Sequence, residues 1–249
     1  MQKIIKLGCI FYLCFISLSV KAQDEKSITS EKNNILKINL PALAFKNISV
    51  QYERVIGKRS SLAVNVRNIP FSDLAFQSKL KSIFDYAVFE YDQFKLGSFG
   101  ITPEFRYYVG KKRVLRGFYL GPFVSYTSYK VNLPIRYNNN SKTGIFDGDL
   151  TSFTGGLQFG SQFKIGKNMF LDWWILGPNY GSASGTLNFA GTLTPSEQSD
   201  LETELEMQKR DAPFNAIKSY SVTSSGANII VKGPWGGLRG LGFSLGFGF

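Results

Sequence analysis

The last nine residues, Leu241–Phe249, alternate large apolar side chains with glycine or serine. A period of two is typical of a β-strand, because successive side chains point to opposite faces of a sheet. One face of this strand needs apolar surroundings, whereas the other leaves room for side chains across a crowded interior. A narrow transmembrane β-barrel meets both requirements. The same alternation recurs at Ile48–Glu53, Leu62–Arg67 and Ser152–Ile165.

Three short turns punctuate these patterns, at Gly57-Lys58, Gly110-Lys111 and Gly166-Lys167. Glycine followed by a polar residue is typical of tight turns, because glycine adopts positive φ at little cost. We therefore expect these three turns to lie on one rim of the barrel.

The other connections are a brief one at 42–47 and long polar stretches at 68–93, 132–149 and 181–226. Short turns on one rim and long loops on the other are typical of bacterial outer-membrane barrels. The prediction is an all-β fold, an eight-stranded antiparallel transmembrane β-barrel with long outer loops. The expected strands are Ile35–Leu40, Ile48–Ile56, Ser60–Arg67, Phe94–Val109, Gly117–Val131, Leu150–Ile165, Met169–Tyr180 and Gly236–Phe249.

The fifth expected strand breaks the rule, because Tyr119, Phe123 and Tyr129 share a face with Gly121 and Ser125. Either aromatic side chains fill the lumen there or the strand carries a bulge. Both interpretations remain open at this point.

The last outer loop contains one helix signal. Thr194 is a typical N-cap residue, Pro195 suits the first helical position and Glu197 completes a capping box. Leu201 and Leu205 follow one turn apart. We expect a short surface helix over the barrel mouth; a helix that plugs the lumen or grips a partner is the alternative.

Residues 1–22 have the features of a secretory signal. Lys3 and Lys6 supply the basic start, an apolar run follows, and Ala22 ends a small-residue cleavage site. We therefore divide the chain into a signal peptide at 1–22, a periplasmic segment at 23–34 and an outer-membrane barrel at 35–249. Both cysteines, Cys9 and Cys14, fall in the signal, so no disulfide is expected.

The alternation also predicts which polar side chains face the lumen. A charge on the lipid side would cost about 2–4 kcal/mol near the bilayer midplane, so charged positions are assigned inward. The predicted polar network of the lumen comprises Glu53, Arg67, Glu104, Arg106, Lys164 and Asp172. Lys37, Asn39, Asn65, Gln158 and Gln162 lie nearby on the same face. We expect these side chains to satisfy one another in a packed interior, because eight strands leave little space.

The chain contains no histidine, which excludes a Ser-His-Asp triad and almost every zinc or haem site. We expect no catalytic residues, no metal and no cofactor. The net charge of +11 falls to +8 once the three lysines of the signal are removed. The basic residues are scattered over turns and loops, which argues against a nucleic-acid partner and favours acidic lipopolysaccharide headgroups.

Several segments resemble small Bacteroidetes outer-membrane barrels. They are the signal end Lys21-Ala22-Gln23, the strand Ile48–Arg54, the segment Gly117–Phe123 and the strand that ends at Phe249. In particular, the chain resembles the DUF3575-type family. The resemblance implies a barrel of the OmpX or OmpA type, with Phe249 as the terminal signal that barrel assembly machinery reads. It implies no catalytic residues.

The leading hypothesis is a non-enzymatic integral outer-membrane β-barrel with a structural or surface-interaction role. Its outer loops would meet an unknown extracellular or envelope partner, and its wall would contact outer-membrane lipid and lipopolysaccharide. One alternative is a soluble, periplasmic, lipocalin-like barrel with an apolar ligand inside, because inverted alternation fits it as well. The other alternative is a narrow channel.

Overall fold

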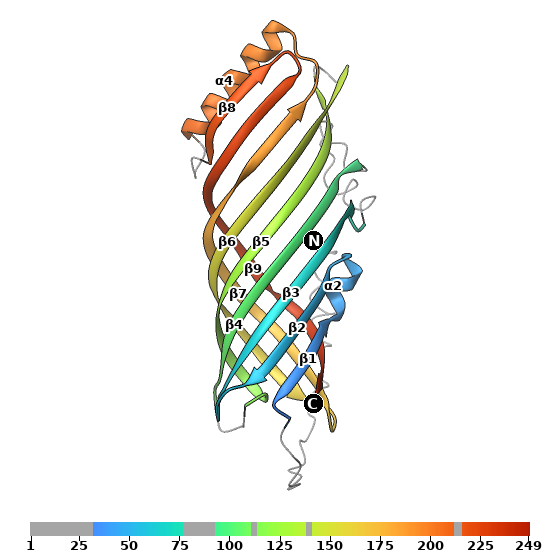
Figure 1. Cartoon of the computed structure of the whole chain (residues 1–249), viewed down its shortest axis with the longest axis vertical. Helices are drawn as coiled ribbons and strands as arrows, with labels where there is room; N and C mark the ends of the chain where they lie inside the picture. The colour runs from blue at the N-terminus through green and yellow to red at the C-terminus, as the bar shows by residue number, and fades with distance from the viewer. Residues whose placement is uncertain (1–31, 77–92, 111–113, 138–140, 212–215) are drawn as a thin grey trace, which may run out of the picture. The chain divides into compact units, whose positions relative to one another are not determined.

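Antiparallel strands make up most of the structure, and their sheet closes into a ring (Figure 1). The computed structural model describes residues 32–76, 93–110, 114–137, 141–211 and 216–249. The expected signal peptide at 1–22 and most of the segment at 23–34 lie outside these residues. The prediction of an all-β, eight-stranded antiparallel barrel is confirmed.

The ring closes because β1 pairs with β2 on one side and with β9 on the other. A ninth strand, β8 (Ile217–Thr223), pairs with β9 and lies outside the ring. It falls within the stretch that the sequence predicted to be a loop. The strands of the ring are β1 (Asn34–Asn39), β2 (Ile48–Val55), β3 (Ser60–Asp73), β4 (Lys95–Tyr108), β5 (Gly117–Tyr137), β6 (Lys142–Lys164), β7 (Met169–Ala190) and β9 (Gly226–Gly248).

The strands have unequal lengths. The pairing of β4 with β5 ends at Lys95 opposite Asn132, and β5, β6, β7 and β9 continue well beyond that point (Figure 1). We call residues 129–137, 142–150, 181–190 and 226–235 the extended sheet.

The loops predicted at 132–149 and 181–226 are therefore wrong over much of their length. Residues 130–137 still alternate polar and apolar side chains, as in Lys130, Val131, Asn132 and Leu133. Their high polarity favoured a loop, whereas the period of two was the better guide.

The described parts of the connections contain two helices. The short α2 (Leu40–Ala44) begins at Asn39, whose side chain accepts a hydrogen bond from the Ala42 backbone at 3.0 Å. The predicted helix in the last loop is confirmed as α4 (Pro195–Asp211). Its capping box forms, because the Thr194 backbone donates to Glu197 Oε2 at 2.8 Å. Among the described residues, no helix is long and apolar enough to cross a membrane.

Below the extended sheet, polar side chains face inward and apolar side chains face outward. On β2, Ser49, Gln51 and Glu53 are buried, whereas Ile48 is 50% exposed. On β9, Ser244 is buried, whereas its neighbour Phe243 is exposed. The period of two thus separates a polar interior from an apolar outer wall.

Two aromatic residues of β5 fill the lumen, which resolves the ambiguity of the fifth strand. Tyr119 and Phe123 are buried, and glycines on the neighbouring β6 make room for them. A Cβ on Gly160 would lie 2.3 Å from Tyr119 Cζ, and one on Gly156 would lie 2.6 Å from Phe123 Cζ. A register irregularity occurs in the next pair of strands, between β6 and β7 at Phe159 and Gly160.

These contacts predict that Gly160→Ala lowers the free energy of unfolding by about 1–3 kcal/mol, because the added methyl group overpacks the lumen against Tyr119. The matched control is Gly155→Ala on the same strand. Its Cβ would point outward and meet only the Phe123 carbonyl oxygen, at 3.8 Å. Urea unfolding in detergent micelles measures both variants; equal losses would contradict the packing argument.

Candidate functional site

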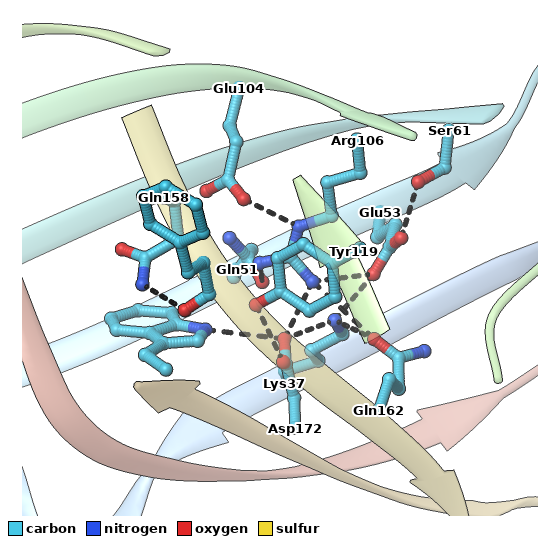
Figure 2. A network of polar contacts seen from close by, with 12 residues as sticks. Lys37, Gln51, Glu53, Ser61, Glu104, Arg106, Tyr119, Gln158, Gln162 and Asp172 are labelled. Atoms are coloured by element: carbon cyan, nitrogen blue, oxygen red, sulfur yellow. Dashed lines mark hydrogen bonds and ion pairs between the residues drawn. The ribbon is translucent and has the colours of Figure 1, made fainter. Parts of the chain in front are cut away.

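Six charged side chains from five strands meet inside the barrel, and we call them the central charge cluster. Figure 2 labels all of them except Arg239. The acids and the bases are equal in number, so the cluster has no formal net charge. Five members are fully buried, and the side chain of Arg239 is 15% exposed. The members are Lys37 on β1, Glu53 on β2, Glu104 and Arg106 on β4, Asp172 on β7 and Arg239 on β9.

Lys37 joins strands that are distant along the chain. Its ammonium group forms ion pairs with Glu53 and with Asp172 Oδ2, the latter at 2.6 Å. It also donates to Gln162 Oε1 at 2.7 Å. Each of its donors therefore has an oxygen acceptor, which a buried ammonium group requires.

Arg106 is the most highly connected member. Its Nε donates to Glu104 Oε1 at 2.7 Å and its Nη1 to Asp172 Oδ2 at 2.6 Å. Its Nη2 donates to Gln51 Oε1 at 3.1 Å. The guanidinium also lies over the Tyr119 ring, 4.2 Å from the centroid. The planar guanidinium thus bonds in three directions within one layer.

Hydroxyl donors complete the coordination of the acids. Tyr108 donates to Glu53 Oε1 at 2.6 Å, and Ser61 donates to the same oxygen. Tyr119 donates to Asp172 Oδ1 at 2.9 Å. Cations and neutral donors together therefore supply the hydrogen bonds of these carboxylates.

Arg239 was missed by the sequence analysis. Its Nη1 donates to Glu104 Oε2 at 2.7 Å, and its guanidinium lies 4.1 Å from the centre of the Trp174 ring. Strict alternation through Leu241–Phe249 would place Arg239 on the outer face. Instead, both Arg239 and Gly242 face inward, so the alternation shifts by one residue between them. The cost of an arginine facing lipid was the available signal.

The structure brings together four of the six residues predicted for the lumen network: Glu53, Glu104, Arg106 and Asp172. Arg67 is half-buried and stands apart, where its Nη2 donates to Thr127 Oγ1 at 3.0 Å.

Lys164 requires a correction, because it is exposed. It is the last residue of β6 and lies at the open rim, where its ammonium group reaches solvent. Among the described residues, Lys164 contributes nothing to the cluster. Lys37 and Arg239 supply the positive charges that the prediction assigned to Lys164 and Arg67.

The ion pairs give every carboxylate of the cluster a structural role. A general base needs a carboxylate or imidazole with a free acceptor, yet here each carboxylate is bound by at least one cation. Within the described part of the chain, no group of three or more His, Cys, Asp or Glu side chains could hold a metal ion.

A second feature lies where α4 meets the extended sheet. A cavity of about 330 Å³ there is lined mainly by apolar side chains. Lys142 at the tip of β6 donates to both carboxylate oxygens of Glu197, at 2.7 and 2.9 Å. The cavity-lining residues are Ile135, Tyr137, Phe146, Phe189, Leu193, Glu197, Asp200 and Leu201.

The position of Glu197 makes its ionisation depend on α4 being docked. The hydrogen bonds from Lys142, and next those from Thr194, lower the pKa of Glu197 below its ordinary value. The side chain therefore contributes to docking as a carboxylate, above its unfolded-state pKa. The contribution is lost as the pH falls through the lowered pKa.

A protein-family profile described as "Protein of unknown function (DUF3575)" matches residues 9–180. The match covers more than half of the chain and ends within β7, before α4 and β9. No curated protein and no solved structure matches the chain.

The cluster predicts a large difference between two identical substitutions. Lys37→Met leaves Glu53 and Asp172 with too little positive charge and should lower the free energy of unfolding by about 3–5 kcal/mol. Lys164→Met at the exposed rim should change it by less than about 0.5 kcal/mol. Urea unfolding of both variants in micelles provides the measurement. Equal effects would contradict the assignment of Lys37 to the cluster.

The Glu197 contact predicts a pH dependence confined to α4. Hydrogen exchange of the α4 amides, corrected for intrinsic rates, should stay slow at neutral pH and accelerate as the pH falls through the lowered pKa of Glu197. Glu197→Gln should exchange faster at neutral pH and lose the acid step. Glu202→Gln, an exposed change on the same helix, should retain that step. A step that persists in Glu197→Gln would assign it to another group.

Proposed function

The chain belongs to the DUF3575 family, and we propose that it is a non-enzymatic integral outer-membrane β-barrel that meets an envelope or extracellular partner through its extended sheet. The proposal rests on the distribution of polar and apolar side chains along the strands. Two observations favour a non-enzymatic role. The charges of the central charge cluster are paired with one another, and the chain contains no histidine.

The observation that carries the proposal is an exchange of faces along single strands. On β6, the outward residues Leu157 and Phe153 are exposed and apolar, whereas the outward residue Asp149, farther along, is charged. On β5, the outward residue Val124 is followed by the outward residue Lys130. Exposed Ile145 on β6 and Ile230 on β9 interrupt the polar surface beyond the band. An apolar band with a predominantly polar surface beyond it is the pattern expected of a wall that leaves hydrocarbon and enters water.

Aromatic residues near the edges of the apolar band support the same arrangement. Tyr126 and Tyr180 are exposed on the outer face close to the extended sheet, and Tyr107 is exposed near the opposite end of the strands. Amphipathic rings are enriched at the two interfaces of a membrane. Soluble monomers rarely expose apolar patches of more than a few hundred Å², so the band favours a lipid environment.

The alternative functions receive less support. A lipocalin-like barrel needs an apolar interior, whereas the buried face here is polar and the apolar face points outward. A channel needs a water path past the cluster, where Lys37 and Arg106 are fully enclosed. Ion conductance in planar bilayers would favour the channel.

The proposed partners follow from position and charge. The apolar band would contact lipid, and the positive net charge of the mature chain would suit acidic lipopolysaccharide headgroups. Phe249 is 55% exposed next to the end of β9, where barrel assembly machinery could reach it. The extended sheet lies beyond the apolar band, so its partner would bind it from outside the membrane.

The proposal predicts opposite reactivities for two single cysteines in intact cells. Cys9 and Cys14 are the native cysteines, and both lie in the expected signal, so the background is low. Lys232→Cys on the outer face of the extended sheet should react with a water-soluble maleimide, whereas Leu157→Cys should react only with a membrane-dissolved thiol probe.

Faster gel mobility before boiling would show that each variant is folded in the outer-membrane fraction. A folded Leu157→Cys variant that reacts freely with the water-soluble maleimide would contradict the membrane assignment. A protein found only in the soluble periplasmic fraction would contradict it as well.

A further inference from the structure

The extended sheet reverses the polarity of the lumen as well as that of the outer wall. Three successive cross-strand rows on its inner face, which begin on β5 at Tyr129, Val131 and Leu133, contain only apolar residues, aromatic residues and glycine. The row below them still contains Thr127 and Ser152. The polar lumen therefore gives way to an apolar inner wall. The uppermost of the three rows comprises Leu133, Phe146, Phe189 and Ala227.

In the part of the chain that the structure describes, α4 and the residues that lead into it cover the tip of this inner wall. Leu193 and Leu201 pack against Phe189 beneath α4 and leave the cavity of about 330 Å³ beside them. Lower down, Val131 and Leu187 remain partly exposed, because the pairing of β4 stops opposite Asn132. An apolar wall that water can reach gains free energy when an apolar ligand covers it.

A cation lies at the foot of the inner wall. Arg67 pairs across β4 through Gly100 with Thr127, and Tyr129 follows two residues farther along β5, about 7 Å away. The Arg67 side chain passes over Gly100, where a Cβ would lie 2.7 Å from Nε. Within the described residues, Arg67 has a hydroxyl partner in Thr127 and no carboxylate partner.

Arg67 differs in this respect from the three bases of the central charge cluster, each of which contacts at least one acid. A half-buried guanidinium without an acid partner favours an anion, which it can bind with two parallel hydrogen bonds. Apolar surface directly above that cation favours a ligand that is apolar beyond its anionic group.

We propose that the inner wall binds a single-chain anionic amphiphile, with its carboxylate or phosphate at Arg67 and its alkyl chain against Val131, Leu133 and Leu187. The site deepens the proposed surface-interaction function and names its ligand class. The alkyl chain runs toward the cavity beneath α4, so longer chains gain contact with the covered tip. Lys142 and Glu197 neutralise each other there and do not select a head group.

The test uses the full-length protein in nanodiscs of zwitterionic phospholipid, with empty discs subtracted for partitioning. Dodecanoate should bind saturably in calorimetry, at one molecule per barrel. Butyrate lacks the chain and should not bind, and dodecyltrimethylammonium, which carries the opposite charge, should bind at least about tenfold more weakly.

Two pairs of variants separate the head contact from the chain contact. Arg67→Gln should weaken dodecanoate binding about tenfold, whereas Lys130→Gln removes a charge from the outer face of β5 and should leave binding unchanged. Val131→Asp should abolish saturable binding, whereas its neighbour on the opposite face, Asn132→Asp, should not. Heat-modifiable gel mobility shows that each variant is folded.

Three results would overturn the proposal: binding no greater than in empty discs, equal effects of Arg67→Gln and Lys130→Gln, or binding that requires deletion of residues 77–92. The third result would mean that this segment of the chain, and not a ligand, occupies the inner wall. Cell fractionation and thiol labelling test the membrane location separately, so a failure of ligand binding leaves that result unchanged.

Discussion

The buried guanidinium of Arg106 constrains the whole interior of the barrel. A buried guanidinium is costly unless acids such as Glu104 and Asp172 lie within hydrogen-bonding distance, and each of these acids is in turn shared with another base. A shift of one strand by one residue would turn its contribution to the opposite face. Buried ion pairs often add little net stability, so the main role we assign to the central charge cluster is to define the register.

Alternation along the strands was sufficient to predict the barrel and to place Glu53, Glu104, Arg106 and Asp172 inside. It could not predict which bases lie deep in the lumen, because a period of two indicates the face that a side chain occupies and not its depth in the barrel. For this reason Lys164, which lies exposed at the rim, was assigned to the network of the lumen. Arg239 was missed because a local slip in the alternation changes which residues face inward, and such a slip depends on pairing with neighbouring strands.

The extended sheet shows a different limit of sequence reasoning. Residues 130–137 keep the period of two, but the side that is apolar changes from the outer to the inner face. A search for an apolar outer face therefore stops at the change, and the remainder is taken for a loop. The cavity beneath α4 was also not predictable, because it depends on how residues far apart in the chain, such as Ile135 and Leu201, come together.

The members of the central charge cluster are distributed from the first strand to the last. Lys37 lies on β1 and Arg239 on β9, and these two strands form the seam that closes the ring. Hairpins formed from the middle of the chain carry Glu104, Arg106 and Asp172 without two of their partners. Neutralisation of the interior and closure of the seam therefore occur together. A partly folded barrel that lacks β1 or β9 would enclose acids without their bases, which disfavours closure before the last strand pairs.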